Sequence, residues 1–451
     1  MLTGAGAVKS LLVRPGCRYA SSATAGDKYK VLVIGGGSAG LAVAQQIFNR
    51  FADAGKPLNK HDIGIVDGTE WHNYQPGWTL VGSGLKQKSE LRKPLAKLIP
   101  SNIAHVAENV ATFSPETNTI TTEAGRTIAY EQLVVAPGLQ INYDAVEGLP
   151  NALADASSGV STIYSYHTCD KTWADIEALR TGRAIFTQPA GIVKCAGGES
   201  FLFNSPQKIM WMAWDRWRQT DRRDKIRIDF FTGQPTMFSV PKYSKALDAL
   251  REERGIGGKF NHNLVSIDAA NHKATFKNAS DGSTVTEDYT FLHVVPPQGP
   301  LNVMKKSPIV DAAGWVEVNK QTLQHVKFPN IWALGDASSL PTSKTAAAAI
   351  AQAPVLTENL FTFVDSGKVG PATYTGYTSC PLLTGYGQLM LAEFQYNAVP
   401  DESFANIFGD QAKPRRAFYH LKKDFFPWIY FNYHVNGQWF GRHGIRPPKF
   451  A

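Results

Sequence analysis

The pattern of hydrophobic and polar residues at the start of the chain predicts a strand, a tight turn and a helix in direct succession. Residues 28–34, KYKVLVI, form a short apolar run, glycines follow, and apolar positions then recur at helical spacing as far as residue 51. A second apolar stretch, DIGIVD at 62–67, ends in an acid after an inserted loop. This order of elements is typical of a nucleotide-binding α/β fold.

The glycines of this turn match the G-x-G-x-x-G fingerprint of dinucleotide-binding folds at Gly35, Gly37 and Gly40. The first glycine permits the tight turn, the second lets backbone approach a pyrophosphate, and the third lets the helix pack on the strand. The helix N-terminus then faces the phosphates. Asp67, at the end of the next strand, is expected to bind a ribose hydroxyl.

Two later stretches favour FAD as this dinucleotide. Residues 130–138, YEQLVVAPG, look like the strand and turn that return a flavoprotein chain to its first domain. Residues 328–352 look like the strand ending in Gly-Asp and the helix that close an FAD site. In such proteins the acid, here Asp336, contacts the ribityl–phosphate region, and the small residues of the helix let it lie close to a ring.

A second βαβ unit is predicted between those two stretches. Residues 183–189 and 225–233 have the pattern of buried strands, and residues 205–221 that of a helix. This is the layout of an NADH domain, but the turn after its first strand, QPAGIVKCAGGES, has no G-x-G-x-x-G in register. Because no glycine allows a diphosphate to approach closely there, we expect an electron donor other than a pyridine nucleotide.

These segments predict an α/β fold, a tandem Rossmann-like flavoprotein with two dinucleotide-binding domains and a C-terminal membrane-interface segment. A chain of 451 residues, 43% of them hydrophobic, is long enough for two or three domains. A transit peptide is expected at 1–26, and the FAD-binding domain is expected in two parts, at 27–159 and 301–365. Between these parts, residues 160–300 are expected to form the second Rossmann-like domain, which lacks an NADH glycine loop. The C-terminal region is expected at 366–451.

The net charge of +8 is concentrated at the two ends of the chain. Residues 1–26 carry Lys9, Arg14 and Arg18 but no acid, which is the composition of a mitochondrial transit peptide; a disordered tail is the alternative. Residues 411–451 carry eight basic residues against one acid, so the remainder is nearly neutral and a broad nucleic-acid-binding face is not expected. No apolar run approaches the roughly 18–20 residues that span a bilayer as a helix.

The chain has four cysteines, too few for a disulfide scaffold, and their spacing matches no metal site. Cys17 is expected to leave with the presequence, and Cys169 is interpreted as structural. Cys195 stands where a second glycine loop would bind nicotinamide nucleotide, and Cys380 follows the helix that closes the FAD site. A small buried hydrophobic residue is the common alternative for each. In a reducing compartment, a disulfide is more readily catalytic than structural.

Several separated motifs resemble segments of the mitochondrial sulfide:quinone oxidoreductase family. They are VKCAGGES with SPQKIM, NYQPGWTLVGSG, LPTSKTAAAAIAQ and GYTSCPLLTGYG, and the resemblance runs from about residue 29 to the C-terminus. It implies an enzyme that binds FAD, oxidises hydrogen sulfide with a redox cysteine pair and passes electrons to ubiquinone. One departure is GGESFLFNS after Cys195, which is longer than the family's link and leaves the route of the sulfur acceptor open.

The resemblance also assigns residues by position. Cys195 and Cys380 match the two catalytic cysteines. Lys344 could stabilise negative charge on the reduced flavin, and Lys194 could lower the pKa of a thiol or be a solvated surface lysine. The positions that match FAD contacts are Gly35, Gly37, Ser38, Ala39, Gly40, Asp67, Gln75, Val110, Asp336 and Lys344.

The residue types fit sulfide chemistry. Sulfide is a soft nucleophile that attacks a disulfide, or a disulfide with an inserted sulfur, and leaves a persulfide on one cysteine while the other is released as a thiolate. We expect the incoming sulfide on Cys380 and the flavin-facing sulfur on Cys195. A small acceptor, glutathione, coenzyme A or sulfite, would then remove the persulfide sulfur.

The C-terminal tail, residues 411–451, interleaves eleven aromatic residues, including Trp428 and Trp439, with its basic ones. Aromatic rings prefer the headgroup zone and cations favour anionic lipids, so we expect a peripheral, monotopic attachment to the matrix side of the mitochondrial inner membrane. The alternative is that these aromatics pack in a homodimer interface. Binding of single-stranded nucleic acid is not expected of a flavoenzyme.

Two other functions fit parts of the pattern. A type II NADH:quinone dehydrogenase shares the fold and the membrane attachment, but it needs the second glycine loop that this chain lacks. A redox-silent flavoprotein that acts as an interaction partner would leave both cysteines idle, so replacing them with serine would then change nothing except stability.

Overall fold

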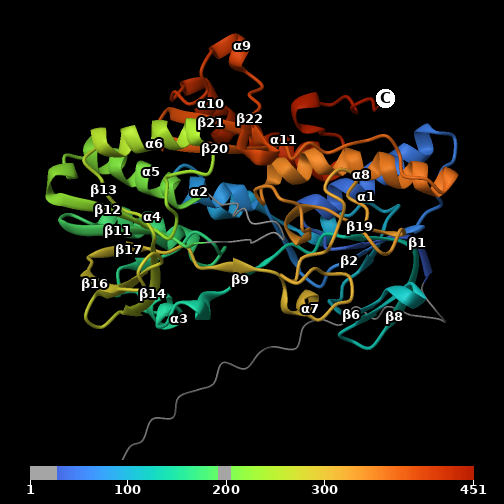
Figure 1. Cartoon of the computed structure of the whole chain (residues 1–451), viewed down its shortest axis with the longest axis horizontal. Helices are drawn as coiled ribbons and strands as arrows, with labels where there is room; N and C mark the ends of the chain where they lie inside the picture. Colours follow the sequence, from blue (N-terminus) through green and yellow to red (C-terminus); the bar gives the residue numbers. More distant parts are fainter. Residues whose placement is uncertain (1–27, 191–204, 451) are drawn as a thin grey trace, which may run out of the picture.

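The structure, a computed structural model, describes residues 28–190 and 205–450. A mixed sheet and a parallel sheet, each with helices packed against it, form the two halves of the molecule, and the C-terminal region lies across both (Figure 1).

The first sheet is built around β1 (Lys28–Ile34). β1 pairs in parallel with β2 (Ile63–Val66) and with β8 (Thr127–Val135). β19 (Ile331–Ala333) also pairs in parallel with β8, so the chain returns to this sheet late in the sequence. Because helices cover the sheet, the central strands β1 and β8 end in continuous buried apolar runs, although both begin with alternating exposed residues. The remaining strands are β5 (Ala104–Val106), β6 (Val110–Ser114) and β7 (Thr119–Thr122).

The second sheet is entirely parallel and contains the βαβ unit that the sequence predicts. β11 (Gly182–Gln188) and β12 (Ile226–Thr232) are neighbours, and α5 (Ser205–Gln219) lies between them in the chain. The tandem α/β architecture is therefore confirmed. The other strands of this sheet are β10 (Val160–Ser161), β13 (Gly257–Lys259) and β17 (Phe291–His293), and the helices beside it include α4 (Cys169–Ala178) and α6 (Pro241–Glu253). A separate antiparallel sheet adjoins it and consists of β14 (His262–Asp268), β15 (Lys273–Asn278) and β16 (Thr284–Asp288).

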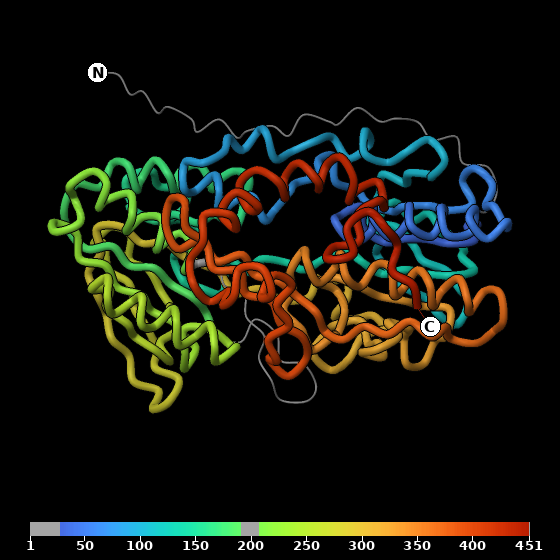
Figure 2. Tube along the Cα trace, turned by 90° about the horizontal axis from the view of Figure 1, so that it is seen from above, coloured from blue at the N-terminus to red at the C-terminus, as the bar shows by residue number. Residues whose placement is uncertain are grey.

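The C-terminal region joins the two halves. β20 (Thr378–Gly385) forms an antiparallel sheet with β21 (Gln388–Gln395) and β22 (Val399–Pro400), and α5 of the second half packs against β20. The chain then crosses to the first half, as the view from above shows (Figure 2). It does so through α10 (Arg416–His420), a π-helical turn η9 (Leu421–Phe425), α11 (Phe426–Asn432) and the short turn η10 (His434–Asn436). Shorter elements are β3 (Trp71–Asn73), α2 (Trp78–Val81), β4 (Arg92–Pro94), β9 (Gln140–Ile141), α3 (Leu149–Ala154), β18 (Gln298–Gly299), α7 (Asn302–Lys305) and α9 (Ala405–Phe408).

One helix differs from the expectation that no segment is long and apolar enough to cross a membrane. α8 (Ala346–Ser366) passes that test by length and composition. However, 61% of its apolar window is buried inside the protein, and the helix packs along α1 (Ser38–Asp53). Its hydrophobic surface is therefore that of a core helix.

Candidate flavin and sulfur site

The glycine turn has the geometry that its sequence requires. Gly35 has a φ of +100°, and a Cβ there would lie 2.4 Å from the carbonyl oxygen of Ala136. A Cβ on Gly40 would lie 1.8 Å from the carbonyl oxygen of Gly35, so the helix packs against the turn too closely for any other residue. Gly37 differs, because a Cβ there would meet no atom within 4 Å. Its missing side chain therefore leaves room for a ligand rather than for the protein.

The start of α1 is open to an anion. Gly37 is its N-cap and no side chain caps the helix, so Ser38 and Ala39 begin a first turn whose N–H groups point along the helix axis. A pyrophosphate beside Gly37 would meet these groups and the positive end of the helix dipole.

Asp67 lies next to this turn, just beyond the end of β2. Its carboxylate accepts hydrogen bonds from the N–H of Gly36, at 2.6 Å, and from the N–H and hydroxyl of Thr69, at 2.8 and 2.6 Å. The acid is thus held at the carboxyl edge of the sheet, where the ribose of a dinucleotide lies in this kind of fold. Val110 begins β6, and the preceding Asn109 contacts Gly68, so the segment expected near the adenosine end is adjacent to Asp67.

The Gly-Asp turn after β19 meets the glycine turn, although the two are distant in sequence. A Cβ on Gly335 would lie 3.2 Å from the Cβ of Ala39. Asp336 follows in this turn, and burial raises the pKa of its carboxyl, while the Lys344 ammonium acts in the opposite direction. Lys344 itself is buried, donates to the carbonyl oxygen of Ser338 at 2.8 Å and lies 4.0 Å from the centre of the Trp315 ring.

These residues fit a bound flavin. Asp336, Ser343 and Lys344 line one narrow pocket at the start of α8, and the buried hydroxyl of Ser343 has no hydrogen-bond partner among residues 28–190 and 205–450. A buried hydroxyl without a partner is costly, so it indicates a ligand group or a water at this place. Together with the open space at Gly37, the pocket would offer contacts to the pyrophosphate and to the flavin half of an FAD molecule. Gln75, the other expected contact, is exposed at the start of a short turn, η1 (Gln75–Gly77).

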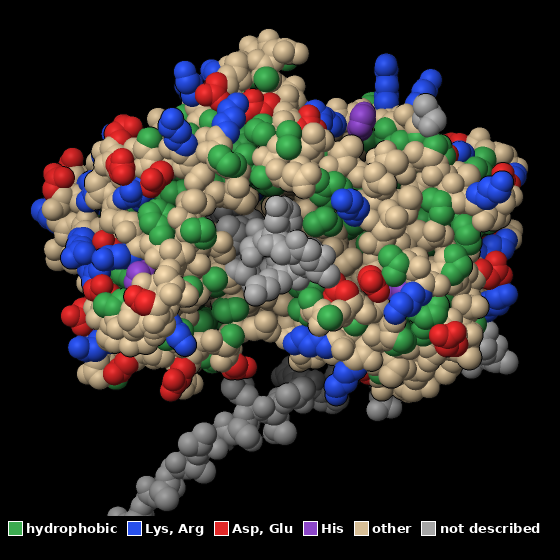
Figure 3. All heavy atoms as spheres, viewed as in Figure 1, with side chains coloured by type: hydrophobic (Ala, Val, Ile, Leu, Met, Phe, Trp, Pro, Cys, Tyr) green, Lys and Arg blue, Asp and Glu red, His purple; other side chains and the backbone are tan. Residues whose placement is uncertain are grey.

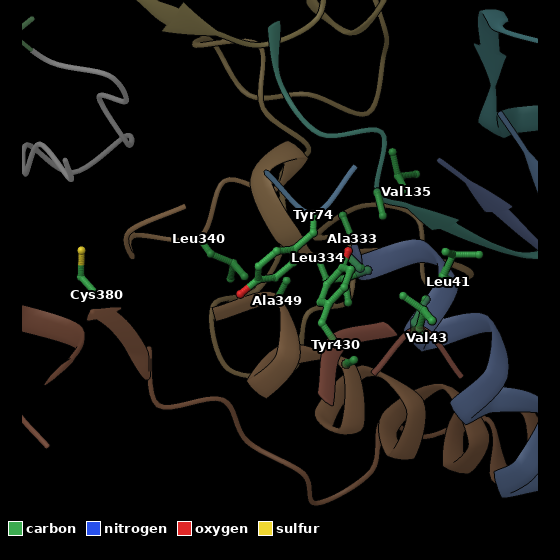
Figure 4. Close-up of a cluster of buried hydrophobic side chains, with 14 of the residues drawn as sticks. Leu41, Val43, Tyr74, Val135, Ala333, Leu334, Leu340, Ala349, Cys380 and Tyr430 are labelled. Carbon is green, nitrogen blue, oxygen red and sulfur yellow. The ribbon is translucent and has the colours of Figure 1, made fainter. Parts of the chain in front are cut away.

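Cys380 is buried in β20, at 7% exposure. Two residues earlier, the hydroxyl of Thr378 is 2.7 Å from that of Thr345, the N-cap of α8, so β20 is tied to the helix that begins at the flavin pocket. Figure 4 shows the Cys380 side chain apart from the cluster of Tyr74, Leu340 and Tyr430. Cys195 and Lys194 lie outside the described residues.

Cys169 has the environment expected of a structural cysteine. It is fully buried at the start of α4, and burial raises the pKa of its thiol to about 11. A thiol with so high a pKa is a poor nucleophile at neutral pH.

Sequence reasoning missed the way the C-terminal tail closes over the glycine turn. Tyr430 and His72 are hydrogen-bonded at 2.7 Å, and the other ring nitrogen of His72 is 3.0 Å from the carbonyl oxygen of Gly36. Burial lowers the pKa of His72, so its ring is neutral; since a carbonyl only accepts, Nδ1 donates to Gly36 and Nε2 accepts from Tyr430. His434 Nε2 likewise donates to the carbonyl oxygen of Ser38 at 3.1 Å.

The tail is therefore not one exposed aromatic strip. Phe418, Tyr430 and Phe431 are buried, while Trp428 is 51% exposed. A second feature that the sequence did not signal is Lys422, which is buried in the π-helical turn and donates to the carbonyl oxygen of Pro76 at 2.6 Å. In the sequence, LKKDFF looks like a solvated basic turn.

The sequence signature of the pyridine nucleotide-disulphide oxidoreductase family matches residues 29–180. Together with the tandem fold and the flavin pocket, it defines the class: a flavoprotein oxidoreductase whose cofactor is FAD. Within this class the chain belongs to the mitochondrial sulfide:quinone oxidoreductase family. It is 47% identical over 440 residues to the mitochondrial sulfide:quinone oxidoreductase of Schizosaccharomyces pombe, which covers 94% of each chain.

Solved structures show the same fold. The sulfide:quinone oxidoreductase of Aquifex aeolicus is 19% identical, with a TM-score of 0.68 over 90% of this chain and 92% of that one. A chain in the mitochondrial ATP synthase structure of Tetrahymena thermophila is 23% identical, with a TM-score of 0.75 over 96% of this chain and 100% of that one. At these identities the likeness is one of fold alone.

Proposed function

We propose that the chain oxidises hydrogen sulfide with the cysteine pair Cys195 and Cys380 and passes the electrons through FAD to ubiquinone. Membership of the family supports this reaction, and the structural observation that carries it is the position of Cys380. This thiol is buried on a strand that is hydrogen-bonded to the N-cap of the helix at the flavin pocket.

The two cysteines supply the sulfur chemistry. Hydrosulfide attacks the Cys380 sulfur of a resting disulfide; a sulfur–sulfur bond to Cys380 forms, the bond to Cys195 breaks, and Cys195 leaves as a thiolate carrying the electron pair. When bound, FAD accepts two electrons and delivers them to a quinone. A thiol or sulfite then attacks the outer sulfur of the persulfide and takes it as sulfane sulfur, which leaves Cys380 as a thiolate. Cys380 and Cys195 then re-form their disulfide, and the two electrons that this oxidation releases would be the pair that FAD accepts.

The flavin-binding residues are proposed from the same geometry. Gly37 and the first turn of α1 would bind the pyrophosphate, Asp67 a ribose hydroxyl and Asp336 the ribityl chain. Lys344 would place a positive charge beside the flavin ring, which favours the anionic reduced form. The enzyme would work as a peripheral protein on the matrix side of the mitochondrial inner membrane, attached through the C-terminal tail.

The test is the choice of reductant by the purified yellow protein. We expect sulfide to bleach the flavin absorbance and NADH to leave it unchanged. Cys380→Ser and Cys195→Ser should each slow sulfide-dependent bleaching by at least about a hundredfold while FAD stays bound. Cys169→Ser is the matched control, because this thiol is equally buried but lies on α4, and it should keep the wild-type rate.

Other results would overturn the proposal. Bleaching by NADH would indicate a type II NADH:quinone dehydrogenase. A flavin that neither reductant bleaches, with no effect of the cysteine replacements, would indicate a redox-silent interaction partner.

A further inference from the structure

Two lysines are buried close to Cys380. Lys208 on α5 is 6% exposed, and Lys422 in the π-helical turn is 3% exposed. Taking an ammonium group out of water costs free energy unless an anion accompanies it or the group gives up its proton. Neither lysine forms an ion pair with a carboxylate among the residues that the structure describes, whereas the buried Lys344 lies close enough to Asp336 for their charges to interact.

Three elements bring these groups together. α5 packs against β20, which places Lys208 and Cys380 on neighbouring elements. Lys422 enters from the C-terminal tail, and its Nζ donates to the carbonyl oxygen of Pro76, the residue after Gln75. Lys422 lies in the π-helical turn, a rare local distortion that is frequent at functional sites.

The charges that act on Lys422 define the chemistry of this cluster. Burial, reinforced by the Lys208 ammonium, lowers the pKa of Lys422 to about 7, and negative charge on Cys380 acts in the opposite direction. The group of η1 that faces Lys422 is the carbonyl of Pro76, which carries no charge. The residues that follow Lys422 in the chain, Lys423 and Asp424, lie at the surface and pair with each other. Near neutral pH Lys422 therefore exchanges its proton readily, and an anion that arrives beside it favours its charged form.

We propose that Lys208 and Lys422 form an anion site beside Cys380 that holds the sulfur anions of the reaction, with Lys422 as the proton acceptor for incoming hydrogen sulfide. This inference rests on the proposed function. In the proton step, an S–H bond of hydrogen sulfide breaks and an N–H bond forms at Nζ of Lys422, so neutral amine and hydrogen sulfide become ammonium and hydrosulfide. The same two ammonium groups then stabilise the thiolate or persulfide anion of Cys380.

The lysine pair also gives the C-terminal tail a role beyond attachment. Because Lys422 belongs to the segment between α10 and α11, the part of the chain proposed to bind the membrane supplies a positioning group to the sulfur site. The lining of the pocket at the start of α8 includes neither lysine, so replacing them should leave FAD bound.

The test compares Lys422→Met, which removes the charge, with Lys422→Arg, which keeps a charge but cannot accept a proton near neutral pH. The first readout is alkylation of Cys380 by iodoacetamide in the reduced protein, followed by mass spectrometry of its peptide. Loss of the charge should slow alkylation at pH 7 about tenfold, because a nearby ammonium stabilises the reactive thiolate, and arginine should keep the wild-type rate. Lys208→Met should slow it likewise.

The second readout is sulfide-dependent bleaching of the flavin as a function of pH, in detergent. Lys422→Met should raise the sulfide concentration for half-maximal rate about tenfold. Lys422→Arg should shift the rise of the bleaching rate to higher pH, because this variant depends on hydrosulfide formed in solution. Lys423→Met, one residue away but at the surface, is the control and should behave as wild type.

Wild-type alkylation and wild-type sulfide dependence in Lys422→Met would overturn the lysine-pair inference. If the wild-type flavin is not bleached by sulfide at all, the proposed function fails instead, and the alkylation rates still report whether the lysines act on Cys380. Should Lys422→Met not fold, Lys422→Arg and Lys208→Met carry the same test.

Discussion

At the scale of single residues, the molecule keeps several titratable groups neutral inside it. The clearest is His293, at the end of β17 in the second half. Its ring is fully buried, neither nitrogen has a hydrogen-bond partner, and burial lowers its pKa to about 3. His434, above the glycine turn, has a pKa lowered to about 4 for the same reason. Both residues make the folded protein sensitive to acid.

The sign of this sensitivity follows from linkage. The pKa of His293 is lower in the folded protein than in the unfolded chain, so between about pH 6.5 and pH 3 the unfolded chain binds more protons. Stability is therefore lost as the pH falls through this window, and at pH 4 the loss due to His293 is of the order of 3 kcal/mol. His293→Leu should be less sensitive to a change from pH 7 to pH 4 in denaturant unfolding, whatever its stability at pH 7.

The exposed His443 provides the matched comparison. His443→Gln should keep the wild-type pH dependence of the unfolding free energy. An equal loss of stability in wild type and His293→Leu between pH 7 and pH 4 would contradict the assignment of a neutral, buried imidazole to His293.

At the scale of elements, the sequence predicted those helices, strands and turns that depend mainly on residues close together in the chain. The strand, glycine turn and helix at residues 28–53 form as expected: Gly40 is required by its contact with the nearby Gly35, and Gly35 by its φ of +100°. The second βαβ unit was also recognisable from its hydrophobic pattern, although its turn lacks the glycine fingerprint. The contact of His434 with Ser38 joins residues 396 positions apart, and no local pattern marks it. Lys422 was missed for the same reason, since its burial depends on packing against Pro76.

The glycine turn also allows ligand binding to be separated from folding. Gly37 has a φ of −74°, which any residue adopts, and a Cβ there meets no protein atom. We therefore expect Gly37→Ala to leave the thermal stability of the FAD-free protein unchanged while weakening FAD binding by about tenfold or more, because the methyl group fills the space for the pyrophosphate. Fluorescence titration with FAD and thermal unfolding measure the two quantities.

Gly40→Ala is the contrasting variant. Its Cβ would lie 1.8 Å from a backbone oxygen, so both the stability of the FAD-free protein and its affinity for FAD should fall. Tight FAD binding by Gly37→Ala would argue against a pyrophosphate at this turn.

At the scale of the whole molecule, the distribution of charged and aromatic residues over the surface bears on which surfaces the protein can bind. On the face shown in Figure 3, basic and acidic side chains are interspersed. Within the tail, four of the eleven aromatic residues are buried and six are half-buried, but Trp428 and the aliphatic Ile445 remain 51% and 63% exposed. Trp428 also lines a cleft of about 250 Å³ with Lys93 and Pro427, and Lys93 lies 4.4 Å from the ring centre of Phe431. The cleft is lined by Lys86 and Lys93 and also by Glu90 and Asp424. An exposed indole beside lysines is the feature that favours an anionic lipid surface.

Trp428→Ala should therefore weaken binding to cardiolipin-containing vesicles, measured by co-sedimentation, by about tenfold, since burying an indole in the interface contributes at least about 1.5 kcal/mol. Bleaching of the flavin by sulfide in detergent should not change, because Trp428 points away from the protein interior, whereas turnover with membrane-embedded quinone should fall. Val326→Ser, which alters an equally exposed hydrophobic residue outside the tail, should bind vesicles as wild type does. If Trp428→Ala instead converts a dimer to a monomer and leaves vesicle binding intact, the exposed part of the tail is an interface between copies of the chain, and the attachment to lipid must lie elsewhere.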